Sequence, residues 1–296
     1  MNGVVKDERW VVTGASGQLG GHILRSLLSD SCVAAVLALV GSRPALPQAP
    51  HVSSINLADL DELRRIVCGW RPTHIVHAAA MTAVADAYAD PPRARRLNVD
   101  ATVAIAEAAA EARARLVFTS TDMVFDGQAA PYPETSAPTA QSVYGKSKIE
   151  AERRLAGLAG VLTVRVPLLY GTPVAARDTT FTRQLAALRA GEALTLFVDE
   201  FRTPIALTDA AAALIGLARS DLTGLIHIAG PRRLSRYDLI AAVARLQNLS
   251  TEKLKPTSRL SIPAPEPRPA DLSLDGTRFL RLLPSLAPRD ISREAF

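Results

Sequence analysis

Tyr144 and Lys148 stand four residues apart, in a segment whose composition favours a helix. On a helix this spacing places both side chains on one face, about one turn apart. A phenol with a pKa of about 10 exchanges its proton poorly at neutral pH, and a nearby ammonium favours the phenolate. The pair is therefore a candidate proton donor with its activating partner. The alternative is a surface tyrosine and lysine that merely share a helix face.

Two hydroxyl side chains, Ser120 and Thr121, end the apolar run that begins at Leu116. In an open parallel sheet, ligands bind beyond the carboxyl ends of the strands. A hydroxyl from Thr121, or from Ser120, could hydrogen-bond a substrate carbonyl while Tyr144 supplies the proton. As a hydride arrives at the carbonyl carbon, charge builds on the oxygen, where both donors would act. The simpler interpretation is that these hydroxyls only cap the end of a strand.

Three glycines, Gly14, Gly17 and Gly20, follow a short apolar run at the spacing G-x-x-G-x-x-G. Such a turn between a strand and a helix lets a dinucleotide pyrophosphate approach main-chain N–H groups, which a Cβ would prevent. Glycine-rich turns also occur without a ligand. The order of glycine turn, hydroxyl-bearing strand end and Tyr-Lys pair makes coincidence a poor explanation.

Elements that could position these residues alternate along the first half of the chain, as in a parallel sheet with crossover helices. The expected strands are Trp10–Thr13, Val33–Val40, Val52–Ile55, His74–Ala79, Leu116–Ser120 and Leu162–Val166. The expected helices are 18–28, 60–68 (capped by Asp59 with Glu62), 92–112 and 143–158.

The second half is less regular. The expected elements are helices at 179–190, 208–219 and 235–247, strands at Leu194–Phe197 and Leu225–Ala229, and an extended proline-rich segment at 262–270. We predict an α/β protein in which residues 1–170 form a Rossmann-like, doubly wound parallel sheet. Residues 171–296 would form a smaller α/β substrate-binding lobe, interleaved with the last Rossmann elements.

Composition narrows the possible partners. The chain has 296 residues, a net charge of +5, and basic residues dispersed in pairs, which gives little support to nucleic-acid binding. The longest apolar run, Val33–Val40, is too short to span a bilayer. Residues 1–10 contain no apolar signal core. We therefore expect a cytoplasmic protein with no nucleic-acid or membrane partner.

The cysteines and histidines suggest no metal chemistry. Cys32 and Cys68 form no C-x-x-C pair, so we expect buried thiols in a reducing compartment. His74 and His77 are three residues apart on a strand and would face opposite sides of the sheet. We therefore predict no metal site.

The chain resembles the extended short-chain dehydrogenase/reductases, and in particular the dTDP-4-dehydrorhamnose reductase family. The resemblance runs nearly from end to end. It is carried by segments 13–20, 77–84, 120–127, 144–148, 165–171 and 202–204, together with Asn98. Segment 120–127, Ser-Thr-Asp-Met-Val-Phe-Asp-Gly, is the most specific of these. In that family it points to reductases of nucleotide-linked 4-keto sugars.

The resemblance implies a role for each matching residue. Thr121, Tyr144 and Lys148 would be the catalytic triad. The cofactor site would comprise Gly14, Ser16, Gly17, Gln18, Leu19, Asn56, Leu57, Ala78, Ala79, Ala80 and Ser120, with Tyr144 and Lys148. The substrate site would comprise Thr82, Val84, Asn98, Met123, Leu168 and Arg202. Arg202 would bind the nucleotide diphosphate, or would alternatively be a solvated side chain.

Several positions depart from the family pattern. Asn56 stands where the family usually has an aspartate that contacts adenine. Ala85 and Asp86 replace a frequent Asp-Lys pair, and Met123 and Leu168 replace bulky aromatic residues next to the sugar. These changes preserve the cofactor-binding fold, but they leave the identity of the sugar undetermined.

The choice of cofactor depends on Arg43, just beyond the second expected strand. An acidic residue there would accept the ribose 2′-hydroxyl of NAD, whereas an arginine can pair with the 2′-phosphate of NADP. The segment Gly41–Pro50 contains no acidic residue. We therefore predict NADPH, with NADH as the alternative.

The leading hypothesis is NADPH-dependent reduction of a 4-keto group on a nucleotide-activated deoxysugar. A 4,6-dehydratase would carry Asp-Glu after the catalytic threonine, where this chain has Asp122 and Met123. An epimerase that retains NAD remains open. A non-catalytic, dinucleotide-binding regulatory protein also remains open, because the β subunit of methionine adenosyltransferase belongs to the same family. Relatives of this kind are often homodimers, which we carry as an expectation.

Overall fold

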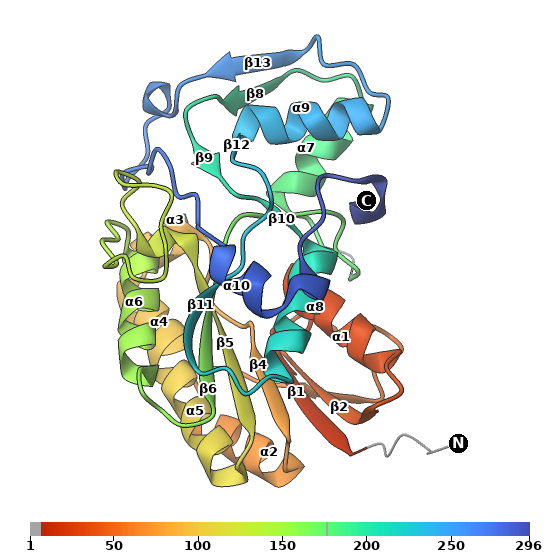
Figure 1. Cartoon of the computed structure of the whole chain (residues 1–296), viewed down its shortest axis with the longest axis vertical. Helices are drawn as coiled ribbons and strands as arrows, with labels where there is room; N and C mark the ends of the chain where they lie inside the picture. The colour runs from red at the N-terminus through yellow and green to blue at the C-terminus, as the bar shows by residue number, and fades with distance from the viewer. Residues whose placement is uncertain (1–6, 176) are drawn as a thin grey trace.

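A seven-stranded parallel sheet forms the centre of the computed structural model, which describes residues 7–175 and 177–296 (Figure 1). The strand order is β11-β6-β5-β4-β1-β2-β3. The strands are β1 (Glu8–Thr13), β2 (Val33–Val40), β3 (His51–Ser54), β4 (His74–His77), β5 (Arg115–Thr121), β6 (Val161–Val166) and β11 (Gly224–His227). The order reverses at β1, so the predicted Rossmann-like, doubly wound sheet is confirmed.

Helices cover both faces of this sheet. One face packs on α1 (Gln18–Leu28) and α8 (Leu207–Ala218), and the other on α2 (Leu60–Trp70), α5 (Ala101–Ala112) and α6 (Val143–Leu155). Successive strand residues enter opposite layers: Val12 lies in the α1/α8 core and Val11 in the α2/α5/α6 core. Both faces are buried, which explains why the strands are almost continuous apolar runs.

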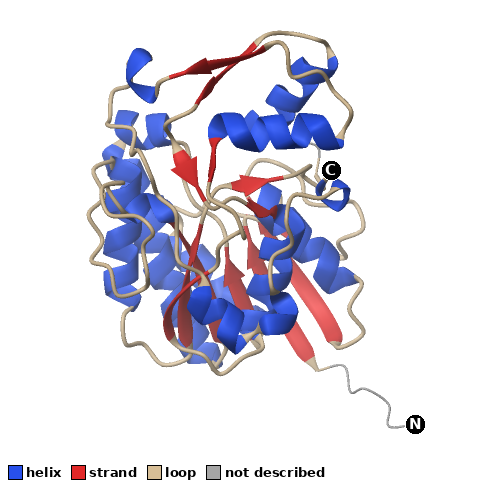
Figure 2. Cartoon of the chain, turned by 45° about the horizontal axis from the view of Figure 1, so that its top comes forward, coloured by secondary structure: helices blue, strands red, loops and turns tan. Residues whose placement is uncertain are grey.

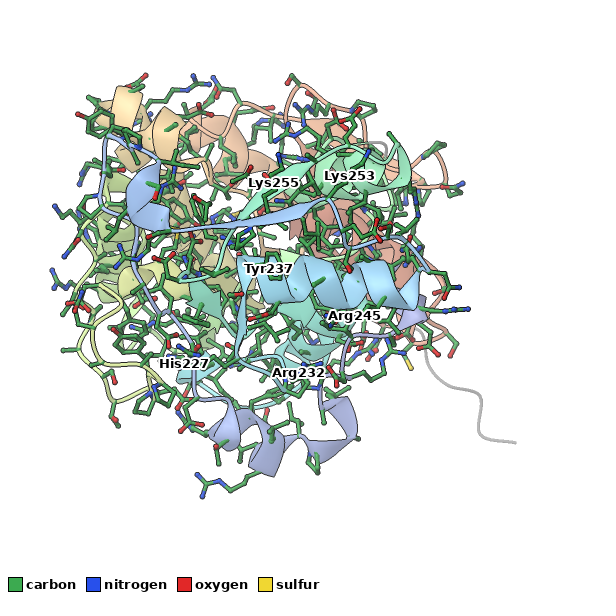
Figure 3. The ribbon with its side chains drawn as sticks, turned by 90° about the horizontal axis from the view of Figure 1, so that it is seen from above. His227, Arg232, Tyr237, Arg245, Lys253 and Lys255 are labelled. Atoms are coloured by element: carbon green, nitrogen blue, oxygen red, sulfur yellow. The ribbon has the colours of Figure 1, made fainter. Side chains whose placement is uncertain are left out.

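The second half of the chain builds a smaller lobe at the carboxyl ends of the strands (Figures 1 and 2). It contains α7 (Thr180–Arg189), β8 (Leu194–Phe197), α9 (Arg236–Leu246) and β13 (Leu254–Thr257), around a core of its own. Figure 3 looks down on this lobe, with Tyr237 and Arg245 along α9. The same half returns α8 and β11 to the main sheet.

Short elements complete the described chain. Two-stranded pairs join β7 (Leu169–Tyr170) to β10 (Ile205–Ala206) and β9 (Phe201–Arg202) to β12 (Leu234–Ser235). The remaining elements are α3 (Val84–Ala89), α4 (Pro91–Arg95), a π-helical turn (Arg96–Asp100), α10 (Thr277–Leu282) and 3-10 turns at Asp122–Val124, Arg259–Ser261, Pro284–Leu286 and Arg293–Ala295. Within residues 7–175 and 177–296, no helix is both long and apolar enough to cross a bilayer.

Several sequence predictions need correction. The helix expected at 143–158 ends at Leu155, and the strand expected to reach Ala229 ends at His227. The helix expected at 92–112 is divided into α4, the π-helical turn and α5, and α3 was not predicted. Asp90 caps α4 by accepting a hydrogen bond from Arg93 N at 3.0 Å. The strand expected to reach Ala79 ends at His77. Cys32 and Cys68 are free but only half-buried, because Cys32 lies in the turn before β2 and Cys68 near the end of α2.

The glycine turn after β1 owes its composition to close backbone contacts. Gly14 has φ +66°, and a Cβ there would lie 2.9 Å from the Cα of Ala79. A Cβ on Gly20, in the first turn of α1, would lie 2.1 Å from the carbonyl oxygen of Gly14. The two glycines therefore let α1 and the end of β4 approach the same turn.

We predict that Gly20→Ala lowers the free energy of unfolding by about 1–3 kcal/mol, because backbone must shift to admit the methyl group. Gly69→Ala is the control: Gly69 lies in α2 with open space where a Cβ would stand, and alanine favours a helix by up to about 1 kcal/mol. Urea denaturation of the three proteins measures both effects. Equal stability of Gly20→Ala and wild type would refute this account of the turn.

Candidate functional site

A cleft of about 480 Å³ lies between the carboxyl ends of β1, β4 and β5 and the smaller lobe. It includes the point where the strand order reverses, which is where open α/β sheets bind ligands. Most of the residues predicted for a site line it: Gly14, Ser16, Gly17, Gln18, Leu19, Leu57, Ala78, Ala79, Ala80, Thr82, Ser120, Thr121, Met123, Tyr144, Lys148, Leu168 and Arg202.

The start of α1 presents free backbone donors to the cleft. Gly17 is the N-cap of α1 and has no side chain that could cap the helix. The first amide of the helix with an acceptor inside the helix is Gly21 N, which donates to Gly17 O at 2.9 Å. The N–H groups of Gln18, Leu19 and Gly20 therefore lack helical acceptors. Together with the helix dipole they suit an anion. The absence of a Cβ at Gly17 keeps the approach open.

A buried hydrogen-bond chain fixes the junction between β1 and β4. Thr102 Oγ1 donates to Asn98 O at 2.8 Å, so it must accept from Nε2–H of His77 at 3.0 Å. The other ring nitrogen of His77 then accepts from Thr13 Oγ1 at 2.7 Å. Burial, and secondly the charge of Lys148, lowers the pKa of His77 to about 3, so the imidazole stays neutral.

Thr13 extends this chain to the cleft wall. Its Oγ1 accepts from the N–H groups of Ala78 and Ala79, each at 3.1 Å. The loop after β4 is thereby held against the glycine turn by side chains that carry no charge.

Tyr144 lies in the first turn of α6 and is 7% exposed. Ser142 caps this helix by accepting from Gly145 N at 3.1 Å. A Cβ on Gly145 would lie 2.3 Å from Met123 O, so glycine after the tyrosine lets α6 touch the turn that follows β5. This contact brings Tyr144 beside Thr121. Burial raises the pKa of Tyr144 to about 12; the Thr121 hydroxyl lowers it and the charge of Asp122 raises it further.

Lys148 lies one turn further along α6 and is only 2% exposed. Its Nζ stands 4.1 Å from the centre of the Phe118 ring, a cation–π contact. Burial lowers the pKa of Lys148 to about 7, and the charge of Glu152 opposes that shift. The predicted spacing therefore delivers Tyr144 and Lys148 to one buried face. The expectation that Lys148 favours the phenolate needs correction, because burial raises the pKa of Tyr144 and lowers that of Lys148.

Ser120 and Thr121 have different partners. Ser120 Oγ donates to Glu152 Oε1 at 2.5 Å, and Arg165 pairs with Glu152 through Nη2 at 2.7 Å. The Ser120 hydroxyl is therefore committed to a structural ion pair. Thr121 Oγ1 accepts from Met123 N and donates to Asp122 Oδ1, both at 3.2 Å, on the side of Tyr144. Of the two hydroxyls, Thr121 is the one placed for a ligand.

Arg202 lines the cleft with its charge already neutralised. Its Nε lies 3.2 Å from Asp122 Oδ2, and its Nη2 lies 3.4 Å from Glu200 Oε1. Burial raises the pKa of Asp122, and the charge of Arg202 opposes that rise. Arg236 also pairs with Glu200, at 2.8 Å, and lines the same cleft. The cluster has two positive and two negative side chains.

Four predicted site residues do not line the cleft: Arg43, Asn56, Val84 and Asn98. Arg43 and Asn56 are exposed. Val84 packs beside Tyr144. Asn98 is fully buried in the π-helical turn, and its amide accepts from Met81 N at 2.8 Å and donates to Ser147 Oγ at 2.9 Å. Asn98 therefore ties the loop after β4 to α6 from behind the cleft.

A second cavity of about 380 Å³ continues from the first, and the two share Gln18, Leu168, Leu169 and Arg236. Apolar residues of the smaller lobe, among them Phe181 and Leu239, line it. Arg268 reaches its wall, 5.1 Å from the centre of the Phe197 ring, with a buried Nε that has no hydrogen-bond partner among the described residues.

Three arginines of these cavities were missed by sequence reasoning: Arg177, Arg236 and Arg268. Each lies in the second half of the chain, far in sequence from the motifs. Arg236 follows the Ser235 cap of α9 and Arg268 lies among the alternating prolines, but neither position has a spacing that marks a ligand.

The profile of the family described as RmlD substrate binding domain matches residues 8–288. Methionine adenosyltransferase 2 subunit beta of Bos taurus is 29% identical, over 93% of this chain and 82% of that protein. A Streptomyces antibioticus protein named "Probable dTDP-4,6-dihydroxy-2-methyloxan-3-one 4-ketoreductase" is 31% identical, over 97% and 94%. The solved structure of a hypothetical dTDP-4-dehydrorhamnose reductase from Sulfolobus tokodaii is 29% identical, with a TM-score of 0.80, over 93% and 94%.

The depressed pKa of Lys148 predicts a pH-dependent stability difference. Below pH 7 the lysine is charged in both states, and the folded state bears the full cost of burying it; the cost is relieved as pH rises towards the unfolded pKa of about 10.4. Lys148→Met should therefore be more stable than wild type near pH 6, on the order of a few kcal/mol. That advantage should shrink between pH 7 and 10.

Lys146→Met is the matched control, because Lys146 is exposed on the same helix. Urea denaturation at a series of pH values measures all three proteins. A stability difference for Lys148→Met that does not change with pH would contradict the assignment of a buried, titrating ammonium.

Proposed function

Because the chain belongs to the RmlD substrate binding domain family, we propose that it is an NADPH-dependent reductase of a nucleotide-linked 4-keto-deoxysugar. One observation carries the proposal: buried Tyr144, with Thr121 and Lys148 beside it, faces the same cleft as the glycine turn. A proton donor and a dinucleotide cradle in one cavity are what carbonyl reduction requires.

The residues present fit a nicotinamide dinucleotide. The free N–H groups at the start of α1 would hold the pyrophosphate, where the absence of a Cβ on Gly17 leaves room. Ala78, Ala79 and Ala80 would line a ribose, and Lys148 would donate to ribose hydroxyls. Arg43, exposed in the acid-free segment after β2, would pair with a 2′-phosphate. When bound, the reduced nicotinamide supplies the hydride.

The chain itself supplies the proton. With a pKa of about 12, Tyr144 keeps its proton at neutral pH and can pass it to the nascent alkoxide oxygen. Thr121 would donate a second hydrogen bond to that oxygen. Lys148, with a pKa of about 7, can return a proton towards Tyr144 within the physiological range.

The second cavity supports a long substrate with a nucleotide at one end. In this proposal Met123 and Leu168 border the sugar beside Tyr144. The nucleotide extends past Leu168 towards Arg236 and Arg268. Arg202 is paired directly with Asp122 and Glu200, whereas Arg268 forms no ion pair among the described residues and has a buried Nε without a hydrogen-bond partner there. Although the charge of Glu200 also acts on it, Arg268 is the stronger candidate for the diphosphate. The Streptomyces antibioticus relative, named as a 4-ketoreductase, supports a keto sugar as the substrate class.

A non-catalytic regulatory role is the second candidate, favoured by the similarity to methionine adenosyltransferase 2 subunit beta. Catalysis separates the two. The reductase needs the Tyr144 proton, whereas a regulatory protein needs only the bound dinucleotide.

We predict that Tyr144→Phe lowers kcat at least about 100-fold, because general-acid catalysis contributes about 10²- to 10⁴-fold. Affinity for NADPH should stay close to that of wild type. The assay follows NADPH oxidation with a panel of dTDP- and UDP-linked 4-keto sugars. Tyr88→Phe, which removes an exposed phenol outside the cleft, is the control and should keep full activity.

Two results would redirect the assignment. Tight NADPH binding by wild type without turnover of any sugar in the panel would favour the regulatory role. Turnover without added cofactor, by protein purified with NAD, would identify an epimerase.

Arg43→Ala should weaken NADPH binding roughly 10-fold or more, because it removes a charge-assisted contact with the 2′-phosphate, and should leave NADH binding unchanged. Fluorescence titration of each reduced nucleotide measures both affinities. Arg153→Ala, which removes an exposed arginine of α6 outside the cleft, is the charge-matched control. An unchanged preference for NADPH in Arg43→Ala would exclude Arg43 as its determinant.

A further inference from the structure

Arg177 comes from the segment between β7 and α7 and reaches the glycine turn of β1 and α1. Its Nη1 lies 3.9 Å from the position that a Cβ would take on Gly17. Both residues line the same cleft. A guanidinium from the second half of the chain thus faces the N-terminus of the first helix, where backbone N–H groups lack helical acceptors.

The surroundings of Arg177 contain positive charge without a compensating acid. Burial, and secondly the charge of Arg43, lowers the pKa of Arg177, and no carboxylate among the described residues raises it. The neighbouring Asp178 is exposed and forms no ion pair with Arg177 in the described part of the chain. The positive end of α1 adds to the same field. Cationic and N–H donors that converge in this way, without an acceptor from the protein, suit a multivalent anion.

We propose that Arg177 binds the cofactor pyrophosphate from the side opposite the α1 amides, so that both halves of the chain hold it. The inference rests on the proposed dinucleotide site and adds a ligand that the glycine motif does not include. Two features place the contact at the pyrophosphate. Arg177 adjoins Gly17, the N-cap of the helix that would cradle that group, whereas Arg43 occupies the segment after β2 that would meet the 2′-phosphate.

This position gives Arg177 a signature different from that of Arg43. The pyrophosphate is common to NADPH and NADH, so loss of Arg177 should weaken both nucleotides equally. Removal of a hydrogen bond to a charged group predicts a loss of roughly 10- to 100-fold for each. Arg177→Lys keeps the charge without the two-pronged geometry and should fall between wild type and Arg177→Ala.

The experiment is fluorescence titration of NADPH and NADH, without substrate, against wild type, Arg177→Ala, Arg177→Lys and Arg183→Ala. Arg183 is exposed on α7 outside both cavities, so its replacement removes the same charge without touching the cleft. Thermal melting of each apoprotein establishes that it is folded. The expected result is an equal loss of both affinities in Arg177→Ala, a smaller loss in Arg177→Lys and no change in Arg183→Ala.

Other outcomes separate the two proposals. Unchanged affinities in folded Arg177→Ala would overturn the pyrophosphate contact and leave the reductase proposal standing. A loss confined to NADPH would also overturn it, because the contact would then be with the 2′-phosphate. If wild type itself bound neither nucleotide, the proposed function would fail with it.

Discussion

The close approach of β1 and β4 at their carboxyl ends is the constraint on which the site depends. Gly14, with φ +66°, lies so near Ala79 that a Cβ would be 2.9 Å from the Ala79 backbone. Thr13 and neutral His77 hold this junction with hydrogen bonds that pass from one strand end to the next. A charged group buried here would need a counter-ion, which would occupy the space that the glycine turn keeps open.

The contact between α6 and the end of β5 is the second constraint, and Asn98 links it to the first. Asn98 joins Met81, in the loop after β4, to Ser147 on α6, and Gly145 lets the helix meet Met123 O. Tyr144 and Lys148 are thereby held in a buried position that disfavours the charged form of either. Burial of Lys148 next to Phe118 costs stability. In the proposed reductase, the same burial gives the proton donor Tyr144 and the proton source Lys148 different pKa values on one helix face.

Much of this arrangement could be predicted from local sequence. The apolar strand runs and the turn at Gly14 follow from backbone geometry, and the pairing of Tyr144 with Lys148 follows from the helical period. Predictions failed where tertiary contacts decide. Asn98 lies in the π-helical turn, where it bonds Met81 and Ser147 and does not line the cleft. Helix α3 has only six residues, too few to give a clear sequence pattern. Arg177 has no sequence signal, because the groups near it, Gly17 in the glycine turn and Arg43 after β2, are more than 130 residues away in the chain.

The distribution of charge along the two joined cavities supports the proposed function. Near Tyr144 and Thr121, Asp122 and Glu200 offset Arg202 and Arg236, so that the centre of the cleft has little net charge. Arg177, towards α1, has no compensating carboxylate among the described residues, and Arg268, in the smaller lobe, forms no ion pair there, although the charge of Glu200 is near enough to interact with it. Two ligands that place their phosphate groups at opposite ends of the joined cavities, with an uncharged reacting centre between them, match this pattern. A dinucleotide and a nucleotide sugar that meet at Tyr144 have this distribution. A single compact anion does not, because it would leave one of the two arginines without a partner.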